Sequence, residues 1–165
     1  MSYNVKKGKR IAEAERGKFR TFEDLDVYKS GREFRKKMYA VARRLPDFEK
    51  FGLASQIRRA AVSLTNNMAE GHGRYHFADQ VRFFLASRGS LQELVDDLNV
   101  GDDEKYLEET EVTELKDKAW HVHGLINGYL RYPRDRKAEG HSRVHERDDD
   151  AFELVEEALS DVAPF

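Results

Sequence analysis

The sequence contains no cysteine and only three prolines in 165 residues. The absence of cysteine excludes disulfides, thiolate metal ligands and cysteine nucleophiles. No apolar run approaches the roughly 18 residues of a membrane-spanning helix, so no membrane segment is expected. Residues 1–20 have no apolar core segment, so they do not resemble a signal peptide. These absences predict a soluble, cytoplasmic protein.

The chain also lacks the motifs that carry common enzyme chemistry. There is no Gly-x-Ser-x-Gly sequence, no phosphate-binding loop and no dinucleotide fingerprint. A di-iron bundle needs a Glu-x-x-His pair on each of two helices, and no such pair exists. His72 and His76 are four apart, but Gly73 lies between them, so we do not expect them to share a helical face. We therefore expect no catalytic residue, cofactor, metal or small-molecule substrate.

Charged residues are abundant and unevenly distributed. They form 36% of the chain, against roughly 25% in an average soluble domain, although the net charge is only −2. Residues 1–20 carry seven basic and two acidic groups, whereas residues 133–165 carry five and ten. A basic arm of this kind can contact nucleic acid. It can equally fold against the acidic tail of its own or a neighbouring subunit.

Apolar residues recur every three or four positions in four segments, which predicts four helices. A capping box at Thr21 and Asp24 is expected to open the first helix, and Pro46 to end it. The second helix is expected to end at Gly71 and Gly73, because glycines suit a left-handed cap.

The third predicted helix ends near Gly101 and the fourth at Pro133. Four helices with short connections predict an all-α fold, an antiparallel up-down-up-down four-helix bundle over residues 21–132. A basic arm (1–20) and an acidic, largely disordered tail (133–165) flank it. The end of the tail also has the spacing of a short amphipathic helix, with apolar positions Phe152, Val155 and Leu159.

A polar stripe runs along the second predicted helix and faces similar residues of the third. We expect Arg59, Glu70 and Glu93 to form partly buried, mutually hydrogen-bonded pairs that set the register of the helices. Gly89 lies within the third helix, where glycine costs about 1 kcal/mol relative to alanine, so a close helix approach is expected there. The predicted structural polar network comprises Gln56, Arg59, Asn67, Glu70, Arg74 and Glu93.

Cations on the arm and the first helix form a second candidate site, for RNA or DNA. Nucleic-acid backbones are bound by clustered cations that release counterions. Residues 21–75 carry eleven basic and seven acidic groups, whereas residues 76–132 carry six and twelve. The candidate nucleic-acid-binding residues are Lys6, Lys7, Lys9, Arg10, Arg35, Lys36, Lys37, Arg43 and Arg44.

Four motifs in a fixed order carry a family resemblance. FEDLDVYKSG, Pro46, FGLASQIRRAAVSLTNNMAEGHGR and FFLASRGSLQEL resemble the four-helix-bundle proteins encoded in intervening sequences of 23S rRNA genes. The resemblance covers roughly residues 21–131. The matching positions are Leu25, Tyr28, Gly52, Leu53, Gln56, Arg58, Arg59, Ala60, Ala61, Asn67, Ala69, Glu70, Gly71, Gly73, Arg74, Phe84, Leu85, Gly89, Ser90, Glu93 and Leu94.

This resemblance implies a homopentameric ring without an established biochemical activity. A related branch contains accessory proteins of diversity-generating retroelements, which bind a reverse transcriptase and nucleic acid through a basic surface. The chain departs from the family pattern at Tyr28, where tryptophan is usual, and at Met68, where isoleucine is usual. Thr65 replaces a common proline, so the second helix is expected to be straighter.

The sequence thus predicts a non-enzymatic, ring-forming scaffold or binding module. Phe83, Phe84 and Leu85 form an apolar strip wider than one intramolecular seam needs, which also indicates an oligomer, with a pentamer favoured by the resemblance. The alternative is a nucleic-acid-binding accessory factor of a reverse transcriptase or of ribosomal RNA.

Overall fold

A computed structural model describes residues 21–138 and 149–160. Within these ranges the protein is all-helical and contains no strand. The elements are η1 (Phe22–Asp24), α2 (Asp26–Arg44), η2 (Asp47–Lys50), α3 (Leu53–His72), α4 (Phe77–Asp103), α5 (Glu109–Ala138) and α6 (Asp149–Ser160).

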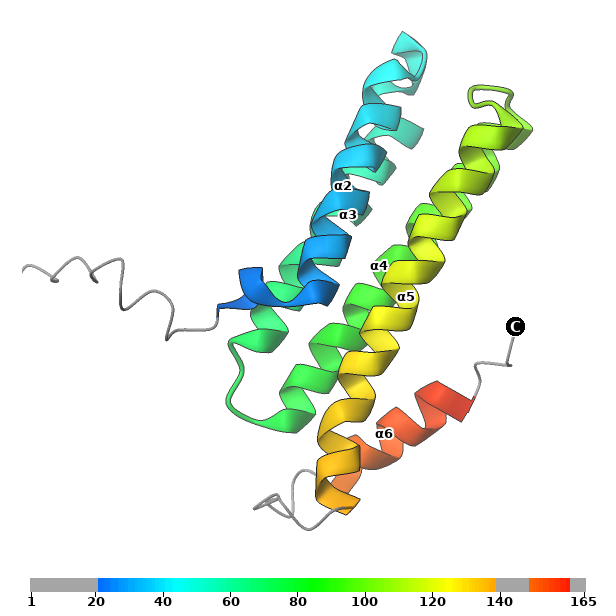
Figure 1. The fold of residues 1–165 in the computed structure, drawn as a ribbon. Helices are drawn as coiled ribbons and strands as arrows, with labels where there is room; N and C mark the ends of the chain where they lie inside the picture. The colour runs from blue at the N-terminus through cyan, green and yellow to red at the C-terminus, as the bar shows by residue number, and fades with distance from the viewer. Residues whose placement is uncertain (1–20, 139–148, 161–165) are drawn as a thin grey trace, which may run out of the picture.

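The four long helices pack side by side around one apolar core (Figure 1). Each contacts two others, because α2 packs on α3, α3 on α4, α4 on α5, and α5 on α2. All four helices contribute fully buried side chains to this core. In each helix the apolar residues recur every three or four positions, so they lie on one face, which is the face that packs inward. The largest are Phe34 and Met38 of α2, Ile57, Leu64 and Met68 of α3, Phe84, Leu91, Leu94 and Leu98 of α4, and Ile126 and Leu130 of α5.

The predicted start and end of the first helix are nearly right. The helix α2 ends at Arg44, two residues before Pro46, because the residue preceding a proline avoids helical geometry. At the other end, the amide N of Thr21 donates to Asp24 Oδ2 at 3.0 Å, as the capping-box pattern predicts. This capping box begins the short helix η1 and not α2. The helix α2 begins at Asp26, two residues after the end of η1 at Asp24.

Three of the predicted helix ends need correction. Gly73 caps α3 with a φ of −77°, so it is not left-handed, and Gly71 lies inside the helix. A Cβ on Gly71 would lie 3.0 Å from Phe83 Cβ, so this glycine permits close packing of α3 against α4. The helix α4 passes Gly101 and ends at Asp103. The helix α5 continues through Pro133 to Ala138, because the φ that a proline ring imposes is compatible with a helix even though proline donates no backbone hydrogen bond.

Gly89 does not have the predicted role within the chain. A Cβ at this position would meet nothing within 4 Å, so no other described helix approaches it. The close approaches occur instead at Gly71 and at Gly31, where a Cβ would lie 3.0 Å from Met68 Cε. The apolar strip is also less open than its sequence indicates, because Phe84 is buried and its neighbours Phe83 and Leu85 are half-buried.

The helix α6 packs across α4 and α5 (Figure 1). It buries Val155 and Leu159, two of the apolar positions that the sequence spacing indicates. Arg88 of α4 donates from Nη1 to the carbonyl oxygen of Ala158 at 2.9 Å. Carbonyls in the last turn of a helix have no partner within it, so Arg88 caps α6 and fixes its position.

Candidate functional site

Part of the predicted cationic set gathers on one face of α2. Arg35, Lys36 and Arg43 line a surface hollow of about 380 Å³ together with Tyr39 of α2 and Val62 of α3. Arg35 Nη1 donates to Thr65 Oγ1 at 2.7 Å, so the hydroxyl that replaces a common proline orients this guanidinium. The N–H groups of Arg35 that make no hydrogen bond to another described residue can bind an anionic ligand.

Two other predicted cations of α2 have different surroundings. Lys37 lines a groove between α2 and α5 rather than the Arg35 hollow. Arg44 forms an ion pair with Glu111 of α5 and donates to the carbonyl oxygen of Ala40, so its charge is partly neutralised. The predicted arm cations Lys6, Lys7, Lys9 and Arg10 lie outside the described residues.

The predicted pairing of Arg59 with Glu93 is confirmed, but its predicted burial is wrong. Arg59 Nη2 donates to Glu93 Oε2 at 2.8 Å and to Gln56 Oε1 at 3.0 Å, which links α3 to α4. The Arg59 and Glu93 side chains are 62% and 49% exposed. Long side chains at the edge of two packed helices reach water easily, so this pair adds little stability.

Glu70 is not part of this pair, so the predicted mutual hydrogen bonding of Arg59, Glu70 and Glu93 is wrong for Glu70. Glu70 forms an ion pair with Arg74 one turn along α3. Asn67 Nδ2 donates to the carbonyl oxygen and hydroxyl of Ser63 at 2.9 and 3.1 Å. Glu70 lies eleven positions after Arg59, which corresponds to about 16 Å along the helix, too far for a hydrogen bond.

The buried polar contacts between α3 and α4 come from serines, which sequence reasoning undervalued. The hydroxyl of Ser87, which is fully buried, donates to the carbonyl oxygen of Leu64 at 2.7 Å. The hydroxyl of Ser90 donates to that of Ser63 at 2.8 Å. The three-residue spacing of Ser87 and Ser90 on α4 could have predicted these contacts. Serine side chains are small enough for two helices to pack closely, and they can form hydrogen bonds when buried.

One carboxyl group near the Arg59–Glu93 pair has a strongly altered proton affinity. Burial, together with the nearby carboxylates of Glu93 and Asp96, raises the pKa of Asp97 from 3.8 to about 6, although Arg59 acts in the opposite direction. Among the described residues, Asp97 Oδ2 is buried and has no hydrogen-bond partner. The sequence does not reveal this, because its cause is the surrounding packing.

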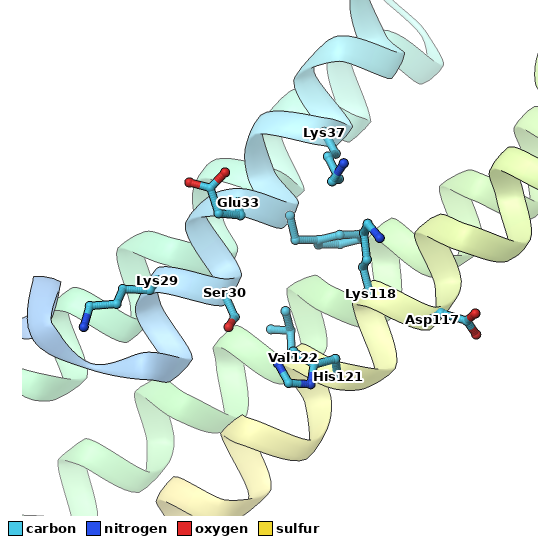
Figure 2. Close-up of a pocket in the computed structure, with 9 residues that line it drawn as sticks. Lys29, Ser30, Glu33, Lys37, Asp117, Lys118, His121 and Val122 are labelled. Atoms are coloured by element: carbon cyan, nitrogen blue, oxygen red, sulfur yellow. The ribbon is translucent and has the colours of Figure 1, made fainter.

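A surface groove of about 460 Å³ lies between α2 and α5, above the line along which they pack (Figure 2). Its deepest lining residues, Phe34 and Val122, are both buried. Around them, the more exposed lining residues are Lys29, Ser30, Glu33, Lys37, Asp117, Lys118 and His121. Sequence reasoning missed this site, because the two walls are about eighty residues apart in the chain and neither carries a recognisable motif.

Within residues 21–138 and 149–160, no group of three His, Asp or Glu side chains is arranged to hold a metal ion. The described helices also include none whose apolar stretch is long enough to cross a bilayer.

Comparison with known proteins identifies the family. No curated protein matches this chain in sequence. The family model described as 23S rRNA-intervening sequence protein matches residues 23–128, which extend from η1 into α5 and leave α6 outside the match. The chain therefore belongs to the 23S rRNA-intervening sequence protein family.

Proposed function

We propose that this protein is a non-enzymatic, ring-forming scaffold or binding module that acts in the cytoplasm. Its unit is an antiparallel up-down-up-down four-helix bundle. The closed cycle of contacts among α2, α3, α4 and α5 supports this topology, as do the opposite chain directions of successive helices in Figure 1. The family resemblance favours a pentamer.

The observation that carries the assembly proposal is a set of open glycines within long helices. A Cβ on Gly89, Gly124 or Gly128 would meet nothing within 4 Å. Each glycine weakens its helix by about 1 kcal/mol relative to alanine without any packing benefit from the described residues. The close approach of another copy would offset this cost. The aromatic rings of Phe48 and Phe51 are 75% and 88% exposed, which adds apolar surface for association.

Light scattering tests the assembly. The wild-type protein should have about five times the 19.2 kDa mass of one chain at micromolar concentration. Gly89→Leu should lower the assembled mass, because the added side chain would hold the neighbouring copy away. Gln92→Leu, which also adds leucine at an exposed position of α4, is the matched control. A monomeric wild-type protein would refute the proposal.

A second candidate function is nucleic-acid binding, as an accessory factor of a reverse transcriptase or of ribosomal RNA. The hollow that groups Arg35 and Arg43 with Tyr39 favours it, because cations beside an aromatic ring suit a phosphate backbone and a stacked base. Lys36 also lines the hollow, but its ion pair with Glu33 offsets part of its charge. Binding should tolerate changes in sequence and weaken steeply with salt.

Gel-shift titration tests this second function. Arg43→Glu should weaken binding of single-stranded RNA or DNA, whereas Lys116→Glu on α5 is the matched charge control. Deletion of residues 1–20 should weaken binding further and leave the helices intact, because these residues precede η1. Failure of the full-length protein to bind at low salt would exclude this function.

A further inference from the structure

We propose that the groove between α2 and α5 is a docking site for one acidic amphipathic helix of a partner protein. The inference depends neither on ring formation nor on nucleic-acid binding. It follows from an apolar floor, from cations on opposite walls, and from the dimensions of the groove.

The surface that the groove presents to solvent is mostly apolar. Phe34 of α2 and Val122 of α5 form its base but are each only 1% exposed, so this apolar surface comes mainly from the side-chain carbon atoms of the residues around them. The groove volume of about 460 Å³ lies above them. One or two apolar side chains placed there would be removed from water, which is the main source of affinity when a helix docks in a groove.

The charged side chains around this floor are arranged asymmetrically. Lys37 of α2 and Lys118 of α5 reach over the groove from opposite walls, whereas the carboxylates of Glu33 and Asp117 point away from it (Figure 2). Glu33 is also neutralised by Lys36, whose Nζ lies 2.6 Å from Glu33 Oε1.

The two lysines that face the groove are available for a partner. Neither Lys37 nor Lys118 forms a salt bridge with another described residue, in contrast to Lys29, which pairs with Asp26 at 3.7 Å. The exposed cations therefore favour a ligand with negative charge on both sides of an apolar stripe.

The dimensions of the groove favour a short helix. Ser30, Phe34 and Lys37 cover two turns of α2, which corresponds to about 10 Å, and a partner helix of three or four turns would cover this length. A helix with apolar residues at positions i, i+3 and i+7 presents one narrow stripe to the floor and carboxylates to both walls. Nucleic acid would use the lysines but leave the apolar floor without a complementary surface.

A binding titration with a defined peptide tests the proposal. The probe is a fluorescein-labelled, helix-forming peptide of fourteen residues with leucines on one stripe and glutamates elsewhere. We expect the full-length protein to bind this peptide. The double variant Lys37→Glu with Lys118→Glu should bind it at least about tenfold more weakly. Ser30→Phe, which fills the groove without changing its charge, should weaken binding similarly. Lys116→Glu is the matched control on α5 and should bind as the wild type does.

The controls define what would overturn the proposal. The same peptide with glutamine in place of glutamate should bind on the order of tenfold more weakly, because it loses its contacts with both lysines. Melting curves should show that the groove variants remain folded. Absence of peptide binding, or equal binding by wild-type and groove variants, would refute the proposal. A lower assembled mass of Ser30→Phe in light scattering would show instead that a second copy of the chain covers the groove.

Discussion

Asp97 shows how the protein environment changes the behaviour of a single residue. Its carboxyl has an ordinary pKa of 3.8, which burial and the neighbouring carboxylates raise to about 6 in the folded chain. The folded chain therefore holds this proton more tightly than the unfolded chain does. Its contribution to folding is most favourable below about pH 4 and is lost as the pH rises to about 6.

Replacing this carboxyl by a neutral amide should stabilise the protein at neutral pH. A rise in the pKa of Asp97 from 3.8 to about 6 corresponds to about 3 kcal/mol, and partial exposure of Asp97 reduces the expected gain for Asp97→Asn to about 1 kcal/mol at pH 7. At pH 4 the gain should largely disappear. Urea denaturation at both pH values measures this, with exposed Asp117→Asn as the control. An equal effect at the two pH values would contradict the assignment.

The ion pairs of α3 lead to a second prediction at the residue scale. The sequence indicates a buried network through Glu70, whose disruption would cost about 3–5 kcal/mol. The structure instead places Glu70 in a pair with Arg74, and the two side chains are 52% and 44% exposed. Glu70→Ala should therefore lower the free energy of unfolding by less than about 1 kcal/mol. If urea denaturation showed that Glu70→Ala lowers the free energy of unfolding by about 3 kcal/mol, Glu70 would belong to a buried network after all.

At the scale of the elements, apolar periodicity was sufficient to predict the four long helices. Each of them has a continuous buried face, so the spacing of residues such as Phe34, Met38 and Leu64 reports the core directly. The helix ends were harder, because Gly71 and Pro133 lie within helices rather than beyond them. Their effect depends on packing against other elements, which local sequence does not contain.

The candidate site was predictable only in part for the same reason. Arg59 and Glu93 could be matched as neighbours because both lie on faces defined by helical spacing. The groove at Phe34, Lys37 and Lys118 depends on how closely α2 and α5 approach each other. That separation is set by the whole core, so no local pattern indicates it.

The helix α6 allows a prediction at the element scale. Arg88 makes a charged hydrogen bond to the Ala158 carbonyl, and such bonds contribute about 1.5–3 kcal/mol. Arg88→Ala should accelerate hydrogen exchange of the α6 amides by about tenfold or more. Exchange in the buried centres of α3 and α4 should change little. Arg82→Ala, which removes an exposed arginine of α4, is the control, and unchanged exchange in α6 would show that Arg88 does not hold it.

At the scale of the whole molecule, the uneven charge distribution matters more than the net charge of −2. Basic groups predominate in residues 1–20 and 21–75, whereas acidic groups predominate in residues 76–132 and 133–165. An acidic helix packed on the folded core makes the electrostatic potential near the protein more negative, so it repels an anionic ligand. The charge of α6 should therefore oppose nucleic-acid binding, if the protein binds nucleic acid.

Substitution tests this effect more cleanly than deletion. Removing residues 133–165 would shorten α5 and also expose the surface that Val155 and Leu159 cover. Glu153, Glu156 and Glu157 are all exposed on α6, so changing the three to glutamine should remove charge and leave helix docking intact.

The glutamine variant should bind single-stranded RNA severalfold more tightly than the wild type at about 50 mM salt, because three repulsive charges are absent. The difference should shrink at several hundred millimolar salt, where the Debye length falls to about 4–5 Å. Changing the exposed Gln92 of α4 to asparagine is a control without a charge change. Equal affinity of the two proteins at low salt would show that α6 exerts no electrostatic control, and an absence of binding by both would leave the scaffold as the surviving function.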